Sequence, residues 1–375
     1  MLQFCLLDGG FDVVALQEVT FDSCQTLEQH FHLVSNIGPR KLGTAILVRK
    51  GIGFKNPLLD PDGRLIAIDV GPITVINIYA PSGARCKDER NEFFCKTVPA
   101  YATATGLPLI LLGDFNCVEN LGDRSEVRNP TNPSRRTSPA LSEMIRGLEL
   151  VDVWTKLRPA DPGHTFFHPQ GSSRLGRAYF TRDIISYCNQ VDIVPTTFSD
   201  HWGLHFCVSS IQTLPRRSTN KAVLWKLNTA VLKEEAYVTM MTSYIQRAVN
   251  HPLREADVSA WWESVFKKGV KQHSIRYCKE RARLARETKL YYQQCINDLV
   301  SAPTLDWAAY QELKMSSRRW EENLLKGFGV RARDGSTDID DEYRYTTLGK
   351  LGKTVEHAIL TPFSHQTGMK LLTGG

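Results

Sequence analysis

Residues 109–120 read LILLGDFNCVEN, and the fold is decided here. An apolar run stops at a glycine and is followed by Asp114 and, two residues later, Asn116. Because alternate residues of an extended chain point the same way, we expect Asp114 and Asn116 to face one cleft while Phe115 faces the core. The stretch therefore predicts a buried strand whose end presents an acidic oxygen beside a neutral amide.

The composition is typical of a globular protein with a sizeable core. Hydrophobic residues make up 42% and charged residues 23% of the 375 residues, which is an ordinary balance. The length allows two domains, or one domain with a long extension. The formal net charge of +6 permits an acidic partner such as nucleic acid, but many plain soluble proteins are equally basic.

Cysteine usage and hydropathy indicate an intracellular protein. The nine cysteines lack CxxC or His/Cys zinc spacing, so we expect reduced and mostly buried thiols. The start, MLQFCLLDGGFDVVALQE, lacks the basic and long apolar regions of a signal peptide. No apolar run approaches the roughly 18–20 residues of a membrane span. We therefore expect a protein of the nucleus or cytoplasm that is neither secreted nor membrane-bound.

Residues 1–210 alternate predicted strands with helices, as in an α/β domain. The predicted strands are short runs of Val, Ile and Leu bounded by Gly, Pro or Asp: Val13–Leu16, Thr44–Val48, Leu65–Val70, Ile73–Tyr79, Pro108–Leu112, Ala178–Thr181 and Gly203–Val208. One helix is well marked, because Ser138 can cap it and Pro139 suits its first turn. Long loops at 117–137 and 159–177 are of a kind that often carries function.

The chain changes character after residue 210. We expect a linker at 211–226, a basic helical connector at 227–332 and a poorly structured tail at 333–375. The basic residues between positions 276 and 289 fit either a solvated, ion-paired helix face or a nucleic-acid contact.

Two motifs in the tail are set aside. GKLGKT (349–354) lacks the earlier glycine of a phosphate-binding loop. DIDDEY (338–343) is predicted to be a solvated acidic turn.

Polar side chains lie at the ends of four predicted strands, where they can converge over one sheet edge. They are Gln17 and Glu18, Tyr79, Asp114 with Asn116, and Asp200 with His201. Each alone is commonplace, as a solvated cap, a core tyrosine or a surface pair. Together, carboxylate and amide oxygens are typical ligands of Mg²⁺, with Mn²⁺ as an alternative ion, and they suit a phosphate substrate.

Five segments, in this order, resemble the endonuclease/exonuclease/phosphatase superfamily, which has the DNase I-like fold. They are VVALQE, INIYAPSG, LLGDFN, SSRLGRAYF and FSDHWGL. The sequence is most similar to the endonuclease domain of LINE-type non-LTR retrotransposons, and VLWKLNTAVLKEEAYV resembles the region that follows that domain. The resemblance implies an α/β fold, a four-layer sandwich of two mixed β-sheets flanked by helices, followed by a helical extension.

The resemblance implies a metal site. Glu18 matches the metal-binding glutamate, and Asp200 matches a further acidic residue close to the metal. The family also begins with a strand that ends in an asparagine, a second metal contact, but no Asn precedes Glu18 here. We therefore expect a site that lacks one ligand, and a central sheet that lacks a strand and exposes an edge.

The resemblance also implies four catalytic residues. Tyr79 matches a tyrosine that contacts the scissile phosphate, and Asp114 matches the aspartate that activates the attacking water. Asn116 matches the residue that positions this water, and His201 the histidine that stabilises the charged phosphate. The family pattern SRIDR places an orienting aspartate where this chain has Gly176, and loss of such a carboxylate costs up to about 10⁴ in rate in other His-dependent enzymes.

We therefore interpret the chain as a Mg²⁺-dependent DNA endonuclease fragment of a retrotransposon polyprotein, impaired, and truncated at the N-terminus and before the reverse transcriptase. Its expected partner is DNA, with RNA bound through the basic connector. One alternative is a catalytically silent nucleic-acid-binding remnant, and a less favoured one is a phosphatase of the same superfamily. Target preference and oligomeric state stay open.

Overall fold

The computed structural model describes residues 11–126, 137–169, 171–197, 199–209, 227, 229–302, 304–326, 356–357 and 368–374. The chain divides into two compact units. Unit 1 comprises residues 1–217 and 342–375, and unit 2 comprises residues 218–341. Among the described residues, no helix has the length and apolar character that crossing a membrane requires. Both tail motifs set aside above, 338–343 and 349–354, lie outside the described residues.

Unit 1 is built around a six-stranded mixed sheet. Neighbouring strands of this sheet are antiparallel, except for β6 and β7, which are parallel to each other. The strand order is β4 (Lys55–Leu59), β5 (Leu65–Val70), β6 (Ile73–Tyr79), β7 (Leu109–Asp114), β12 (Gly176–Thr181) and β9 (Leu150–Asp152).

Three smaller antiparallel sheets complete unit 1. The first has the order β15 (Glu356–His357), β1 (Val13–Val19), β3 (Gly43–Arg49) and β2 (Phe31–Ile37). The second is β13 (Cys188–Val194), β14 (Gly203–Ser209) and β16 (Gly368–Gly374). The third is β10 (Phe166–His168), β11 (Gly171–Ser173) and β8 (Arg124–Glu126).

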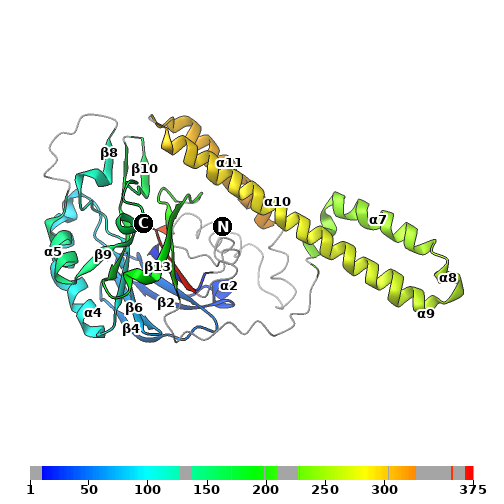
Figure 1. Ribbon diagram of the computed structural model, residues 1–375, viewed down its shortest axis with the longest axis horizontal. Helices are drawn as coiled ribbons and strands as arrows, with labels where there is room; N and C mark the ends of the chain where they lie inside the picture. The colour runs from blue at the N-terminus through cyan, green and yellow to red at the C-terminus, as the bar shows by residue number, and fades with distance from the viewer. Residues whose placement is uncertain are drawn as a thin grey trace. The chain divides into compact units, whose positions relative to one another are not determined.

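Both faces of the six-stranded sheet are buried at the inner strands β5, β6, β7 and β12, which explains the nearly continuous apolar runs of those strands. Ile66 and Ile68 of β5 enter the core shared with β1, β3 and β14, whereas Leu65 and Ala67 enter a second core. That second core is closed by helices α4 (Val98–Thr105) and α5 (Pro139–Gly147). Figure 1 shows α4 and α5 on one side of β6 and β9, with β13 and β2 on the other side. The predicted fold class, a mixed α/β sandwich flanked by helices, is confirmed.

Short helices connect these strands. They are α2 (Gln25–Glu28), η1 (Ala84–Cys86), α3 (Lys87–Glu92), η2 (Phe93–Thr97), η3 (Leu121–Asp123), α6 (Val153–Leu157) and η5 (Ile185–Tyr187). The predicted cap of α5 is present, because Ser138 Oγ accepts a hydrogen bond from the Leu141 amide at 3.3 Å.

The expected open edge is not found at the two strands beside the candidate site. β14 pairs with β13 on one side and with β16 on the other, and β1 pairs with β3 and β15. β15 and β16 both lie in the segment, 333–375, for which the sequence predicts a poorly structured tail. The last strand is drawn in red in Figure 1.

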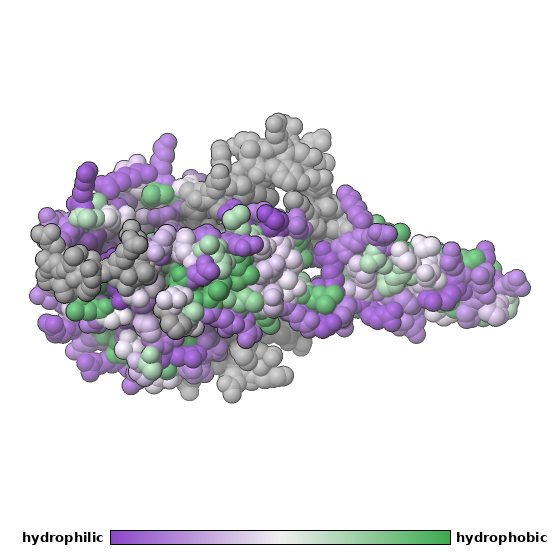
Figure 2. Space-filling view, turned by 90° about the horizontal axis from the view of Figure 1, so that it is seen from above, coloured by the Kyte–Doolittle hydropathy of each residue, from purple (hydrophilic) through white to green (hydrophobic). Residues whose placement is uncertain are grey.

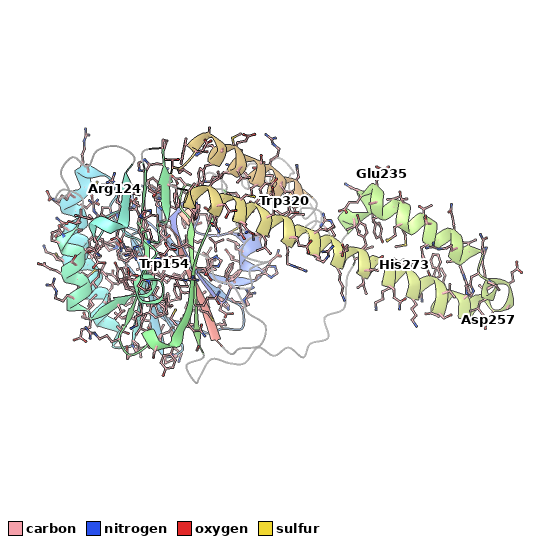
Figure 3. All side chains as sticks on the ribbon, turned by 45° about the horizontal axis from the view of Figure 1, so that its top comes forward. Arg124, Trp154, Glu235, Asp257, His273 and Trp320 are labelled. Atoms are coloured by element: carbon pink, nitrogen blue, oxygen red, sulfur yellow. The ribbon has the colours of Figure 1, made fainter. Side chains whose placement is uncertain are left out.

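Unit 2 is helical. Its elements are η6 (Thr229–Lys233), α7 (Glu235–Val249), α8 (Leu253–Ala256), α9 (Val258–Trp261), η7 (Trp262–Lys267), α10 (Lys268–Ser301) and α11 (Trp307–Lys326). Figure 3 shows α7 leaving Glu235, the chain turning near Asp257, and α10 returning past His273. The small core between α7 and α10 contains Tyr237 and Met241, and Tyr237 Oη lies 2.8 Å from Ser274 Oγ.

Candidate active site

The carboxylate of Asp114 is the most deeply buried acid among the strand-end residues. It ends β7 and is 1% exposed. Burial, together with the negative charges of Glu18 and Asp200, raises the pKa of Asp114 to about 7. A hydrogen bond from the Asn116 amide to Asp114 Oδ1, at 2.9 Å, opposes that rise. A carboxyl group with such a pKa exchanges protons near neutral pH, as a general base requires.

Glu18 and Tyr79 form a direct pair between two sheets. Tyr79 Oη donates to Glu18 Oε1 at 2.5 Å. Burial, followed by this hydrogen bond and the charge of Glu18, raises the pKa of Tyr79, so the phenol stays protonated and remains a donor. The Arg64 guanidinium lies over the Tyr79 ring, 5.2 Å from its centroid.

The backbone at Glu18 is unusual. Its φ is 55°, in the left-handed region that non-glycine residues rarely adopt. The pairing of β1 with β3 shifts register between Leu16 and Val19, so Glu18 lies in a bulge. Bulges re-aim side chains, and this one turns Glu18 to meet Tyr79.

The neighbourhood of Asn116 differs from the extended chain that the sequence predicts. β7 ends at Asp114, and Asn116 has a φ of 49°. Its side chain donates from Nδ2 to the Ala80 carbonyl at 2.9 Å. Asp114 and Asn116 therefore meet through a tight turn rather than through strand alternation. The prediction for Phe115 holds, since this ring is fully buried and packs against Tyr179, with centroids 5.3 Å apart.

Asp200 and His201 lie just before β14. Asp200 is exposed, and its charge acts on Asp114. His201 is 5% exposed, and its ring centroid lies 4.7 Å from that of Phe166. The His201 amide donates to Ser199 Oγ at 3.0 Å.

Thr165 connects the segment of His201 to the strand beside Asp114. Its carbonyl accepts the Trp202 amide at 2.7 Å. Its hydroxyl oxygen accepts the amides of Leu175 and Gly176 at 3.1 and 2.9 Å. Gly176 is paired with Asp114 across β12 and β7. The position where the family pattern has an aspartate is therefore adjacent to the candidate base.

The structure brings five of the six predicted residues into one electrostatic and hydrogen-bonded group: Glu18, Tyr79, Asp114, Asn116 and Asp200. His201 joins them through the backbone contacts of Thr165. Carboxylates that raise one another's proton affinity would be relieved by a positive ion beside them. Within the described ranges, however, no three His, Cys, Asp or Glu side chains are grouped so that they could hold a metal ion.

Sequence reasoning missed a polar bridge between the sheets. Gln17 Nε2 donates to Asn77 Oδ1 at 2.6 Å, and Asn77 Nδ2 donates to the carbonyls of Leu16 and Ala45 at 2.9 and 3.0 Å. Asn77 is completely buried. The signal in the sequence was an amide inside an otherwise apolar strand, two residues before Tyr79.

Sequence reasoning also missed a buried ion-pair network beside the loop that follows Asn116. Arg177 is 1% exposed and lies 2.7 Å from Asp123 Oδ2. Arg174 contacts Asp123 Oδ1 and Asp152 Oδ2, both at 2.8 Å. Charged residues are mostly exposed, so nothing in SSRLGRAYF marked these two arginines as buried.

Sheets packed face to face, with carboxylates at their strand ends, define the DNase I-like class of hydrolases. Within this class, the chain belongs to the Endonuclease/Exonuclease/phosphatase family, whose profile matches residues 6–201. The chemistry of this family generally depends on a divalent metal ion.

Solved structures of low sequence identity are also similar. A 3′ phosphatase from Neisseria, NExo, solved with a product DNA hairpin, is 21% identical over 54% of this chain and 90% of its own, with a TM-score of 0.46. An AP endonuclease from Archaeoglobus fulgidus is 19% identical over 52% of this chain and 87% of its own, with a TM-score of 0.44. The AP endonuclease LMAP from Leishmania major is 20% identical over 51% of this chain and 76% of its own, with a TM-score of 0.41.

Proposed function

We propose that unit 1 is a metal-dependent endonuclease that hydrolyses DNA phosphodiester bonds, with Mg²⁺ as the preferred ion and Mn²⁺ as an alternative. The observation that carries this proposal is the environment of Asp114. It is a buried carboxylate whose pKa of about 7 is raised by burial and by Glu18 and Asp200. A group of acids that raise the pKa of one of their members, despite the opposing charge of Arg90, suits a cation and a phosphate substrate.

Asp114 acts as the general base. A water molecule attacks the phosphorus in line with the leaving oxygen, and the Asp114 carboxylate takes the proton of that water. A base with a pKa near the working pH is efficient, because it is deprotonated in a large fraction of molecules yet still basic. The Asn116 amide keeps one carboxylate oxygen, Oδ1, in place at 2.9 Å.

Glu18 and Asp200 are the residues that hold the metal. When bound, the ion supplies positive charge to the phosphate oxygens. Glu18 is preset for this role, because the bulge in β1 and the hydrogen bond from Tyr79 fix its direction. Asp200 is exposed and remains accessible to an ion that arrives from solvent.

The other residues orient the phosphate. Tyr79 stays protonated, and its single hydroxyl proton, which Glu18 accepts in this structure, would turn to a phosphate oxygen when Glu18 holds the metal. Asn116 positions the attacking water through its side-chain amide. His201 donates to the phosphate oxygen on which charge develops, and a donor aimed at that oxygen stabilises the transition state.

We further propose that the chain derives from a LINE-type retrotransposon polyprotein. Residues 1–210 would be its endonuclease domain, 211–226 a linker and 227–332 the basic connector. The support is the order of five motifs in unit 1 and the helical unit that follows them. DNA is the expected substrate, and the ancestral activity is nicking.

Plasmid nicking tests the activity. Pure protein is incubated with supercoiled plasmid and Mg²⁺ or Mn²⁺, beside Asp114→Asn and the matched control Asp183→Asn. Asp183 is exposed beyond the far end of β12, so the control should nick like the parent. The proposal fails if the parent produces no more open circles than Asp114→Asn.

A second candidate function is nucleic-acid binding by unit 2, with RNA as the favoured partner. A groove of about 1040 Å³ lies along α10 and is lined by apolar Met240 and Tyr277 and by cationic Arg276, Lys279 and Arg286. Cations beside an aromatic ring are typical of single-stranded nucleic-acid sites. Figure 2 shows that the surface of the α7–α10 hairpin is mostly hydrophilic, in keeping with a charged partner.

The charge of this groove is not fully neutralised within the protein. Arg283 is paired with Glu280 at 2.5 Å and with Glu287 at 2.6 Å. Those two acids compensate only part of the positive charge on this face. The remaining cations are spaced along successive turns of α10, so they can follow a phosphate backbone.

Binding of a fluorescent single-stranded RNA, measured at several salt concentrations, tests this second function. Replacing Arg276, Lys279 and Arg286 together by Gln should weaken binding and reduce the salt slope by about 0.7 per lost phosphate contact. The control Arg318→Gln removes an exposed cation that is paired with Glu322 at 3.0 Å. RNA binding without any nicking would favour the catalytically silent remnant, and Gly176→Asp should then restore little activity.

A further inference from the structure

The C-terminal strand β16 covers the edge of the strand that follows His201. It pairs antiparallel with β14 along the full length of both strands, from Gly203 opposite Gly374 to Ser209 opposite Gly368. β14 begins two residues after His201. The end of β16 therefore lies beside the segment that carries Asp200 and His201.

The same part of the chain reaches the strand of Glu18. β16 lies alongside β1 and also contacts β7 and β12 of the six-stranded sheet. β15 pairs with β1 at Leu16 opposite His357 and Gln17 opposite Glu356. These pairings end one residue before Glu18. β15 and β16 thus contact the strand of Glu18, and β16 also pairs with the strand that follows Asp200.

We propose that residues 368–374 are a positioning element that holds the Asp200–His201 segment against the strand of Glu18. Without them, β14 would have one unpaired edge, and β1 would lose its contact with β16. An unpaired edge inside a core is costly and accepts another extended chain. The effect on catalysis rests on the proposed function, whereas the placement of the strand does not.

A disulfide trap tests the placement in the full-length protein. Lys370 is directly opposite Cys207 in the register. Opposed residues of antiparallel strands have Cα atoms about 4.5–5.5 Å apart, which lies within the range of disulfides. Lys370→Cys should form a disulfide with Cys207 under mild oxidation, identified by mass spectrometry of the proteolysed protein. Leu371→Cys, one position along and on the other face, should not.

The disulfide experiment also decides whether β16 pairs with β14 of its own chain or of a second copy. A mixture of ¹⁵N-labelled and unlabelled Lys370→Cys protein should give only uniformly labelled disulfide peptides, because the strand belongs to its own chain. Mixed peptides would assign it to a second copy and overturn the proposal. So would the absence of a Cys207 disulfide at position 370, or equal trapping at position 371.

Removal of residues 368–375 tests the positioning role. The shortened chain should lose at least 10-fold in nicking rate and regain activity when a peptide of sequence QTGMKLLTGG is added. The same peptide with its second leucine replaced by proline should not restore activity, because proline cannot supply a ladder hydrogen bond. If the disulfide forms but the peptide does not restore activity, the positioning role is contradicted while the strand placement stands. A full-length chain that never nicks would contradict the proposed function and leave the strand placement intact.

Discussion

Gln17 and Asn77 join the two facing sheets next to the candidate site: Gln17 Nε2 donates to Asn77 Oδ1 at 2.6 Å, and both side chains are completely buried. Gln17 immediately precedes Glu18, and Asn77 lies two residues before Tyr79. The hydrogen bond between Glu18 and Tyr79 is therefore accompanied by a second hydrogen bond between the same two strands, in the core. Gln17 Oε1 has no hydrogen-bond partner among the described residues, but the other polar atoms of the bridge are paired, and buried hydrogen bonds of this kind fix one relative placement of two packed layers.

Asn77→Ala should destabilise unit 1. The substitution leaves Gln17 and two strand carbonyls without the Asn77 amide, and orphaned buried groups together with a small cavity cost about 2–4 kcal/mol. Urea denaturation measures this loss. Asn189→Ala, which removes an exposed amide, serves as the control. A loss below about 0.5 kcal/mol, typical of surface substitutions, would contradict the structural role given to the bridge.

Asp114→Asn should abolish nicking and yet stabilise the metal-free protein at high pH. The folded pKa of Asp114 is about 7, above its ordinary value of 3.8, so the folded state holds this proton more tightly. Parent stability therefore falls as pH rises between about 4 and 7. Above that window the variant should be more stable by roughly 4 kcal/mol.

Thermal unfolding in EDTA at pH 5 and pH 8 checks the prediction for Asp114. The variant should gain stability over the parent at pH 8, and most of this gain should vanish at pH 5. Asp183→Asn should show no such dependence, because that carboxylate is exposed. Equal stability of parent and Asp114→Asn at pH 8 would show that the buried carboxylate is not strained.

The sequence predicts best where the periodicity is strong. The strands at 65–70 and 73–79 are mostly apolar and fully buried, and the structure has them at the predicted bounds. β2 and β13 escaped notice because they are partly exposed and mix polar with apolar residues. β10 and β11 lie in segments rich in Gly and Ser that resemble loops. β16 could not be foreseen, because its pairing with β14 spans more than 150 residues of chain.

The same distinction applies to the candidate site. Strand ends bring Glu18, Tyr79 and Asp114 together, as expected, because neighbouring strands fix where their ends meet. The left-handed backbone of Glu18 has no signal in the local sequence, whereas that of Asn116 suits an asparagine in a turn that begins at Asp114. The conformation of Glu18 follows from a bulge that tertiary contacts impose, and such strained residues cluster at functional sites.

Asp123→Asn should cost about 3 kcal/mol near neutral pH, because it leaves the buried Arg177 without its closest partner. Burial disfavours the charged carboxyl, but Arg177 and Arg174 outweigh burial and hold the pKa of Asp123 below 3.8. This contribution to stability is complete above pH 3.8 and disappears as pH falls through the lowered pKa.

Urea unfolding at pH 7, 4 and 3 checks the prediction for Asp123. The difference between parent and Asp123→Asn should be largest at pH 7 and should narrow at pH 3. Asp62→Asn, at an exposed position, should differ little from the parent throughout. A difference that stays constant down to pH 3 would assign the loss to packing rather than to the ion pair.

Gly269→Ala should destabilise the pairing of α7 with α10, although alanine is the better helix former by roughly 1 kcal/mol. A Cβ at position 269 would lie 1.7 Å from Tyr244 Oη. That phenol cannot simply withdraw, because it donates to the Val265 carbonyl at 2.5 Å and its ring packs 4.2 Å from that of His273.

Hydrogen exchange of the full chain should therefore accelerate at least 10-fold across residues 235–249. Gly147→Ala, where a Cβ meets open space, should leave exchange in α5 unchanged or slower, and unchanged exchange in both variants would contradict this packing.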